Sequence, residues 1–451
     1  MSDASPRPAI LVAIRTLGCK VNRTESEALV EELLGAGAEL VDEDAADVVV
    51  VNTCTVTAEA DAKARKAVRH ALRAPREPIV VVTGCLAALD PAALQGLGSR
   101  VVVEADKTLL AKRVLARVAG SGGARREILQ AGGAAERRGV PGRSLDRAEG
   151  PSGAGQDPRA HRTRATVKVQ DGCDHRCAYC IVPDARGNPV SVPTGDVVGR
   201  VAALVASGTS EVVLTGVTLG RYERGLAGLV ESVARTGIRR IRLSSIEPMD
   251  LTPKLLGTLA SNAAVMPHLH VPLQSGCDRT LAAMGRGYDA AGFADAIARA
   301  RAALPGLAVT TDVIVGFPGE SDADFAESLA FVEACGFSRL HVFRYSPRPG
   351  TPAAGMDGRV GPRDSADRAR AMRALGERLA TAYASARVGG RASVLFERVG
   401  DDVAEGTSED YLRVHVRRAD EATDPLRSGE VLEVELTAAE RGGAWGSVVR
   451  C

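Results

Sequence analysis

Six of the nine cysteines in this chain directly follow segments that we predict to be β-strands, and they form two groups of three. One group is compact, with the spacing C-x3-C-x2-C inside a single loop, and the other is dispersed over three separate loops. Three thiolates can hold three irons of a four-iron, four-sulfur cluster and leave the fourth iron open for chemistry. The compact group is Cys173, Cys177 and Cys180, and the dispersed group is Cys19, Cys54 and Cys85.

Short β-branched runs alternate with amphipathic helical patterns between residues 10 and 119, which predicts a doubly wound α/β domain. One helix is expected to begin near Thr24, with Glu27 completing a capping-box pattern, and another is expected over 58–74. Sheets of this kind place their sites at the carboxyl ends of the strands, so the dispersed cysteines can converge. The strands are expected at 10–15, 47–51, 79–82 and 100–103.

A strand-loop-helix unit repeats about six times between residues 165 and 385, which predicts an open (βα)6 partial barrel. From about residue 388 the pattern changes to alternating strands separated by turns, which is typical of a small antiparallel β-barrel. The strands of the partial barrel are expected at 165–170, 211–214, 240–243, 268–273, 309–315 and 339–343, and those of the small barrel at 391–397, 411–417, 431–436 and 444–449.

The fold class is therefore α/β with an additional small β-barrel, and these patterns divide the chain into four segments. The cysteine-bearing doubly wound domain is expected over 8–120, the partial barrel over 161–386 and the small barrel over 387–451. Between the first two lies a flexible Gly- and Arg-rich linker at 121–160, whose composition is typical of a segment without a packed core.

Composition favours a cytoplasmic globular protein. The chain is 45% apolar but has no uninterrupted apolar stretch long enough to cross a bilayer, so no membrane association is expected. The N-terminus lacks the features of a secretory signal. In the cytoplasm thiols stay reduced, and clustered cysteines indicate metal ligands or catalytic groups before disulfides. The net charge of +1 gives little overall attraction to nucleic acid.

The sequence favours this interpretation of the cysteines over three alternatives. The compact group could form a zinc site with His175, although it lacks the paired C-x2-C halves of common zinc sites. The dispersed cysteines could simply be buried apolar residues, but each lies among Gly, Asn and Thr. A non-catalytic iron–sulfur electron carrier normally closes every iron with a protein ligand, whereas both groups here supply three. The remaining cysteines, Cys277, Cys335 and Cys451, lack that context and are not predicted to be ligands.

The compact loop, with an aromatic residue before its last cysteine, resembles the radical S-adenosylmethionine superfamily. Together with the dispersed cysteines and the domain order, the chain resembles the methylthiotransferases within that superfamily. The flanking sequences Thr-Leu-Gly-Cys-Lys-Val-Asn at 16–22 and Asn-Thr-Cys-Thr-Val-Thr at 52–57 resemble the MtaB branch, which acts on tRNA. Two sister branches, which modify isopentenyladenosine or a ribosomal-protein aspartate, usually show Tyr-Gly-Cys-Gln-Met-Asn or Leu-Gly-Cys-Pro-Lys-Asn at the first cysteine.

This resemblance implies an enzyme with two [4Fe-4S] clusters and S-adenosylmethionine as cofactors. The compact cysteines would hold the cluster that binds S-adenosylmethionine, and the dispersed cysteines would hold an auxiliary cluster that handles sulfur. The reaction would replace the C2–H of N6-threonylcarbamoyladenosine 37, in the anticodon loop of tRNA, with C–SCH3. A low-potential electron donor such as flavodoxin or ferredoxin and a sulfur source would be the other partners. A radical is needed because that aromatic C–H is not acidic.

The resemblance also implies binding residues, and it has two departures. Asp184 stands where relatives commonly have an aromatic residue, and the segment 188–191 lacks an Arg that is often found there. The small barrel resembles a TRAM domain, an RNA-binding module, although residues 387–451 hold nine Arg against thirteen Asp or Glu. The candidates to line the S-adenosylmethionine pocket are Tyr179, Thr215, Gly216, Ser245, Glu247, Gln274 and Gly316, and the candidates to contact substrate are Arg186, Arg413 and Arg417.

Overall fold

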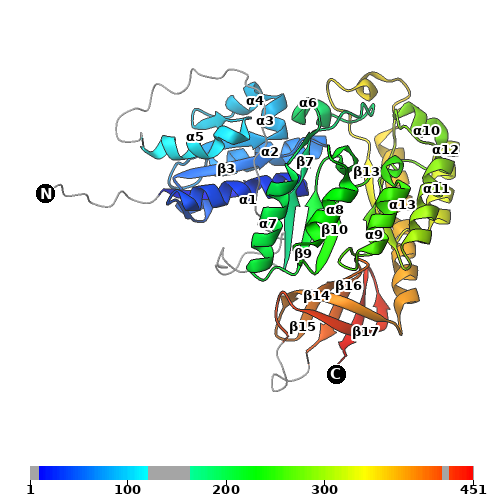
Figure 1. Cartoon of the computed structure of the whole chain (residues 1–451). Coiled ribbons are helices and arrows are strands. Elements are labelled where there is room, and N and C mark those ends of the chain that lie inside the picture. The colour runs from blue at the N-terminus through cyan, green and yellow to red at the C-terminus, as the bar shows by residue number, and fades with distance from the viewer. Residues whose placement is uncertain (1–9, 120–162, 419–425, 450–451) are drawn as a thin grey trace. The chain divides into compact units, whose positions relative to one another are not determined.

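The computed structural model describes residues 10–119, 163–418 and 426–449. These residues form two compact units. The first unit contains the described residues up to 119 together with Asp171–Asp174 and Ile181–Asn188, and the second contains the rest. The predicted linker at 121–160 lies outside the described residues. Figure 1 gives the element labels that are used below.

The first unit is built on a parallel five-stranded sheet in the order β2-β1-β3-β4-β5. Its central strands are valine runs that are buried on both faces, as expected for a parallel sheet covered by helices on each side. The strands are β1 (Leu11–Thr16), β2 (Glu39–Leu40), β3 (Val48–Thr53), β4 (Ile79–Gly84) and β5 (Val101–Val103), and the helices are α1 (Lys20–Gly35), α2 (Ala58–Ala71), α3 (Cys85–Leu89), α4 (Pro91–Gln95), α5 (Lys107–Ala119) and α6 (Val182–Arg186).

The predicted capping box at Thr24 is wrong, because α1 begins four residues earlier, at Lys20. Thr24 lies inside the helix, and its hydroxyl donates to the Lys20 carbonyl at 3.0 Å. Contacts with the sheet set the true start. The Asn22 side-chain amide donates to the carbonyls of Leu17 (2.9 Å) and Thr53 (2.8 Å), which fixes the first turn of α1 at the ends of β1 and β3.

The second unit contains six parallel strands in sequential order, which confirms the open (βα)6 partial barrel. Strands β6, β9 and β10 form one sheet and β11, β12 and β13 another, and the parallel bridges Ile241–Val265 and Ser245–His270 join them. The barrel strands are β6 (Arg164–Lys168), β9 (Glu211–Thr215), β10 (Arg240–Leu243), β11 (His268–His270), β12 (Ala308–Val315) and β13 (Arg339–Arg344); two short strands are β7 (Gln170–Asp171) and β8 (Val190–Ser191); the helices are α7 (Thr194–Ala206), α8 (Leu226–Ala234), α9 (Pro253–Ser261), α10 (Asp278–Ala283), α11 (Ala290–Ala303), α12 (Asp322–Cys335) and α13 (Pro362–Arg387).

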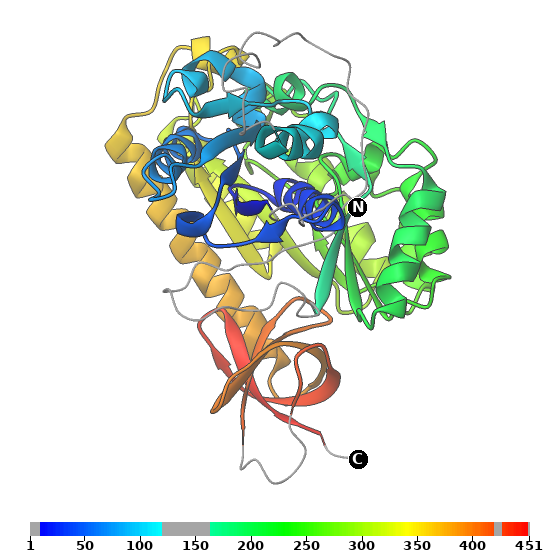
Figure 2. The same cartoon turned by 90° about the vertical axis from the view of Figure 1, so that its left-hand side faces the viewer.

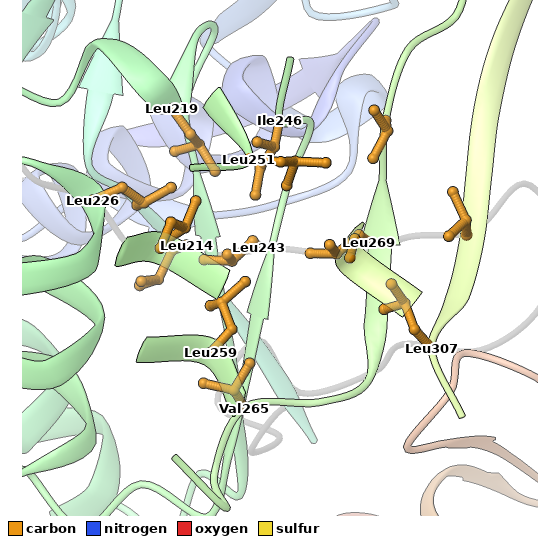
Figure 3. Packing of buried hydrophobic residues seen from close by; sticks show 14 of the residues in the cluster. Leu214, Leu219, Leu226, Leu243, Ile246, Leu251, Leu259, Val265, Leu269 and Leu307 are labelled. Carbon is orange, nitrogen blue, oxygen red and sulfur yellow. The ribbon is translucent and has the colours of Figure 1, made fainter. Parts of the chain in front are cut away.

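Alternate residues of the barrel strands pack against the surrounding helices in one hydrophobic core. Figure 3 shows Leu214, Leu243 and Leu269, contributed by three of the strands, in this core. Because successive strand residues point to opposite faces, the residues between these apolar positions face the inside of the barrel. The polar chemistry of the barrel therefore belongs to its inner face and to the ends of its strands.

A closed five-stranded barrel follows the long helix α13, as Figure 2 shows for the end of the chain coloured orange to red. Its strand order, β14-β15-β16-β18-β17, combines antiparallel pairs with one parallel pair, β16 with β18. Strand β15 was not predicted from the sequence. The strands are β14 (Arg391–Val399), β15 (Val403–Ser408), β16 (Arg413–Arg417), β17 (Val431–Glu440) and β18 (Gly443–Val448).

Within the second unit, two buried arginines connect the first barrel strands to this small barrel. Glu211 accepts from Arg240 and from Arg242, each at 2.8 Å, and it is completely buried. Arg242 in turn donates to the carbonyl of Ser408 at 2.6 Å, and Arg240 donates to that of Ser393 at 2.9 Å.

Within the described residues, none of the helices combines the length and the apolar character that crossing a membrane requires.

Candidate cluster and cofactor sites

The three dispersed cysteines of the first unit lie at the carboxyl ends of three adjacent parallel strands. Cys19 caps the N-terminus of α1 just beyond β1, Cys54 follows β3, and Cys85 is the first residue of α3 after β4. Because β1, β3 and β4 are neighbours in the sheet, all three thiols belong to one sheet edge. Cys54 and Cys85 are buried, whereas Cys19 is exposed.

Two glycines let these loops approach closely. A Cβ on Gly18 would lie 2.4 Å from the Cβ of Cys54 and 2.8 Å from its Sγ, and the φ of Gly18 is +101°. Gly84 has a φ of +92°, and a Cβ there would lie 2.3 Å from the Thr53 carbonyl oxygen. Any side chain at either position would push the cysteine loops apart, so the close approach requires glycine.

Burial dominates the electrostatics of the two inner thiols. It raises the pKa of Cys54 to about 11, and the neighbouring Cys19 and Cys85 add to the rise through repulsion between thiolates. Burial also raises the pKa of Cys85, and Arg186 and Lys107 oppose it with their positive charges. A positive metal centre at this sheet edge would favour the deprotonation of all three thiols. This donor set fits an iron–sulfur cluster held by three cysteines.

Arg186, a predicted substrate contact, is buried in the first unit and surrounded by protein groups. Its guanidinium donates to the Asn22 side-chain oxygen at 2.6 Å, to Glu25 at 3.0 Å and to Asp171 at 2.9 Å. Lys107 also pairs with Glu25, at 2.5 Å. Asn22 and Glu25 lie on the helix that follows Cys19, and Asp171 lies two residues before Cys173. Arg186 therefore connects a segment of each cysteine group.

Backbone contacts hold the start of the compact cysteine loop in the same unit. The Cys173 amide donates to the Gly187 carbonyl at 3.0 Å. Gly172 has a φ of +75°, and a Cβ there would lie 2.1 Å from the Asn188 carbonyl oxygen. The residue next to Arg186 and the residue before Cys173 are therefore packed backbone against backbone, and only glycine fits at position 172.

The other two cysteines of the loop belong to the second unit, where an arginine contacts them. One guanidinium nitrogen of Arg286 lies 3.2 Å from the Cys177 sulfur and 3.4 Å from the Tyr179 hydroxyl, while another pairs with Glu247. Between the cysteines, the Ala178 amide donates to the Met284 carbonyl at 2.8 Å. This brings two predicted residues, Tyr179 and Glu247, to the same cation.

Sequence reasoning missed Arg286 because the residue is far along the chain from the cysteine loop and has no spacing signal of its own. Its Nε donates to the Tyr288 hydroxyl at 3.0 Å, and that hydroxyl donates to the Pro272 carbonyl at 2.8 Å. Burial raises the pKa of Tyr179 well above its ordinary value, although Arg286 opposes the shift. Burial likewise raises the pKa of Glu247, again opposed by Arg286.

The remaining predicted S-adenosylmethionine contacts lie at the carboxyl ends of successive strands. Thr215 ends β9, and the Gly216 amide donates to the Ser244 hydroxyl at 3.2 Å. Gln274 has a φ of +71°, which is unusual for a residue other than glycine. Its backbone amide donates to the backbone carbonyl of Asp312 at 2.8 Å. Ser245, two residues beyond β10, forms a parallel bridge with His270, and Gly316, with a φ of +74°, follows β12.

The predicted RNA contacts Arg413 and Arg417 lie on the outer face of β16 in the small barrel. Both are exposed. Arg413 lines a cavity of about 680 Å³ whose wall also includes Arg339 and Arg373. Arg417 lies over the Trp445 ring, 5.3 Å from its centroid. Arg186 belongs to the other compact unit, so the predicted substrate contacts are divided between the two.

Comparison with known proteins identifies two families within the chain. Residues 167–332 match the Radical SAM superfamily, and residues 11–103 match the Uncharacterized protein family UPF0004. The first match covers most of the partial barrel with its compact cysteine loop. The second covers the sheet that carries the three dispersed cysteines.

Relatives of similar length cover almost the entire chain. It is 35% identical over 442 residues to the threonylcarbamoyladenosine tRNA methylthiotransferase MtaB of Bacillus subtilis, covering 95% of this chain and 94% of the relative. The MtaB of Thermotoga maritima is 34% identical over 409 residues, covering 89% and 90%. The tRNA-2-methylthio-N(6)-dimethylallyladenosine synthase of Anaeromyxobacter dehalogenans is 37% identical over 459 residues, covering 97% and 94%.

A solved structure supports the fold alone. The radical S-adenosylmethionine methyltransferase TsrM from Kitasatospora setae, with cobalamin and a [4Fe-4S] cluster bound, aligns with a TM-score of 0.56. The alignment covers 77% of each chain at 16% identity.

A partial barrel with a C-x3-C-x2-C loop, in a chain that also has a sheet with three further cysteines at one edge, defines a radical S-adenosylmethionine enzyme with an additional cysteine site. The extent and identity of the matches show more. The chain belongs to the radical S-adenosylmethionine tRNA methylthiotransferase family, whose cofactors are S-adenosylmethionine and two [4Fe-4S] clusters.

Proposed function

We propose that this enzyme converts N6-threonylcarbamoyladenosine 37 of tRNA to its 2-methylthio derivative. The chain matches MtaB enzymes over nearly the full length of both chains, and the observation that selects this acceptor is the sequence around the first two dispersed cysteines. The flanks of the first two dispersed cysteines, Lys20-Val21-Asn22 and Thr55-Val56-Thr57, also resemble that branch. The substrate is therefore the anticodon loop of tRNA.

Each cysteine group has its own role in this proposal. Cys173, Cys177 and Cys180 hold the cluster that binds S-adenosylmethionine and supplies one-electron chemistry when loaded. Cys19, Cys54 and Cys85 hold the auxiliary cluster, at the sheet edge where Gly18 and Gly84 allow the loops to meet.

The protein residues around the first cluster bind and orient the cofactor. Arg286 places a fixed positive charge beside the Cys177 sulfur and aligns Glu247 and Tyr179 toward the same region. Thr215, Gly216, Ser245, Gln274 and Gly316 line the strand ends, where exposed backbone and small side chains let a ligand approach. Holding the reacting atoms close and excluding water is the main contribution of the chain to such a reaction.

The small barrel is proposed to be a TRAM-like module over 387–451 that contacts RNA, and the partial barrel is proposed to extend over 161–386. The net charge of residues 387–451 is negative, so a local basic face of the small barrel must make the contact. The wall of one cavity includes six Arg, Arg413 among them, against four acidic residues, and this excess of positive charge supports such a face there. Arg417 is the other candidate.

The reaction also needs a low-potential electron donor, such as flavodoxin or ferredoxin, and a sulfur source. A cytoplasmic location completes the proposal, since tRNA is the substrate.

A second acceptor has specific support. The dimethylallyladenosine synthase of Anaeromyxobacter dehalogenans is 37% identical over 97% of this chain, slightly above the identity to the MtaB enzymes. The bulk identity therefore does not separate the two adenosine acceptors, and only the cysteine flanks favour the threonylcarbamoyl derivative.

Mass spectrometry of tRNA nucleosides separates these acceptors. In a deletion strain we expect 2-methylthio-N6-threonylcarbamoyladenosine to disappear and its unthiolated precursor to accumulate, because C2 is no longer modified. Complementation with the wild-type chain should restore the product, and complementation with Cys54→Ala should not. Loss of the methylthiolated dimethylallyladenosine instead would assign the second acceptor, and unchanged tRNA nucleosides would contradict both.

A further inference from the structure

Three potential metal ligands, which belong to neither cysteine group, meet on the inner face of the partial barrel. His270 ends β11, Asp312 lies on β12 and His341 lies on β13. Strand register brings them together, because His270 is paired with Thr310 and Asp312 with His341. One ligand atom from each residue lies within 4.8 Å of those of the other two.

Their orientation follows from the alternation of the strands. The neighbouring residues Leu269, Val313 and Val342 belong to or pack on the hydrophobic core under the helices. The triad therefore points to the opposite side, into the barrel. His270 and Asp312 are half-buried, whereas His341 is exposed, so an ion could enter from the side of His341.

The spacing of the ligand atoms suits a small divalent ion. His270 Nε2 lies 3.3 Å from one Asp312 oxygen, and His341 Nδ1 lies 3.1 Å from the other. Two ligands about 2.0–2.1 Å from a tetrahedral zinc ion are separated by about 3.3 Å. The two imidazole rings have centroids 5.4 Å apart, and each contacts a different oxygen of the Asp312 carboxylate.

A second layer of polar contacts orients the ligands. His270 Nδ1 lies 2.9 Å from the hydroxyl of Thr310, which is buried, and the same hydroxyl lies 3.1 Å from His268 Nε2. When Nδ1 of His270 donates to Thr310, its Nε2 presents a lone pair toward Asp312. Metal-bound histidines typically use their second nitrogen in this way.

We propose that His270, Asp312 and His341 bind a divalent transition-metal ion of the zinc class inside the barrel. Two imidazoles and one carboxylate form a donor set that such ions prefer. With three protein ligands, the ion would keep at least one position open toward the barrel interior for water or for an oxygen of the substrate. The site is distinct from both cysteine groups, and it does not depend on which nucleoside the enzyme modifies.

Zinc binding to the holoenzyme tests this proposal. The enzyme is loaded with both clusters, so that its cysteine groups are occupied, and is dialysed against graded Zn²⁺ before metal analysis. We expect one zinc ion per chain with wild type. His341→Gln and Asp312→Asn should weaken that binding at least tenfold, and Thr310→Val should weaken it by roughly tenfold, because outer contacts typically contribute 10–100-fold to affinity. His341 is exposed, so His341→Gln should fold normally, as circular dichroism would verify.

A matched control removes a histidine from a simple histidine–carboxylate pair. His70 Nδ1 lies 3.2 Å from Glu43 on the surface of the first unit, without a second imidazole in that pair. His70→Gln should retain the zinc stoichiometry of wild type. Equal zinc affinity in wild type, His341→Gln and Asp312→Asn, or no zinc bound by wild type, would overturn the proposal. Neither result would affect the assignment of the methylthiolation reaction, which is measured on tRNA.

Discussion

Cys54→Ala should still cleave S-adenosylmethionine but should form no methylthiolated tRNA, whereas Cys177→Ala should lose both activities. The reason is the separate placement of the two cysteine groups. Cys54 lies between β3 and α2 on the sheet edge of the first unit, and Cys177 lies in the loop beside Arg286. Removing one of three ligands disrupts the cluster that those ligands hold, while the other cluster keeps its full set.

The measurement is the release of 5′-deoxyadenosine from anaerobically reconstituted protein, together with nucleoside analysis of the tRNA. Cys335→Ala is the matched control, because Cys335 is a buried thiol at the end of α12 that belongs to neither group. It should retain both activities. If Cys54→Ala abolished cleavage while the compact cysteines still held their cluster, separate roles for the two groups would be contradicted.

Arg186→Gln should destabilise the first unit and reduce its iron content. The guanidinium of Arg186 is buried and donates hydrogen bonds to Asn22, Glu25 and Asp171. The substitution removes the cation that the carboxylates of Glu25 and Asp171 share. Breaking a buried ion pair by removing one partner costs roughly 3–5 kcal/mol. Lys107 still pairs with Glu25, so we expect a value near the lower end. The substitution also removes a positive charge that acts on the Cys85 thiol.

Thermal unfolding of the apoprotein and iron per chain after reconstitution are the two measurements. Arg186→Lys retains the charge but not the planar fork that contacts several oxygens, so it should restore only part of the stability. Arg76→Gln is the control, since Arg76 forms an exposed pair with Asp47 in the same unit and should cost less than about 1 kcal/mol. Wild-type unfolding and iron content in Arg186→Gln would refute a structural role for Arg186.

The sequence predicted the six strands of the partial barrel and four of the five strands of the first sheet because their signals are local, and it missed the two-residue strand β2. Valine runs and short alternating segments identify β1, β3 and β4 to within a residue or two. Strand β15 was missed because Val-Ala-Glu-Gly-Thr-Ser has weak strand propensity. Its Gly406 is needed there, since a Cβ would lie 2.5 Å from Val394 and 2.6 Å from the Leu395 carbonyl oxygen of the adjacent strand.

The site was predictable only where a residue type carries the chemistry. The six cysteines are identified by their thiols and by their positions after strands. Arg286 contacts Cys177 across 109 residues of sequence, and Arg186 contacts Asn22 across 164. No periodic pattern in the sequence indicates contacts of this kind. The start of α1 was misplaced for the same reason, because Asn22 is held by carbonyls of two strands rather than by a local cap.

Iron and sulfide per chain, with Mössbauer spectra of anaerobically prepared protein, test the central claim that two cysteine triads hold two separate clusters. We expect about eight irons in wild type, because each triad holds one four-iron cluster. We expect about four when Cys19, Cys54 and Cys85 are all replaced by alanine, and about four when Cys173, Cys177 and Cys180 are replaced. A wild-type chain with only four irons, or a dispersed-triad variant that keeps the full wild-type content, would contradict the account.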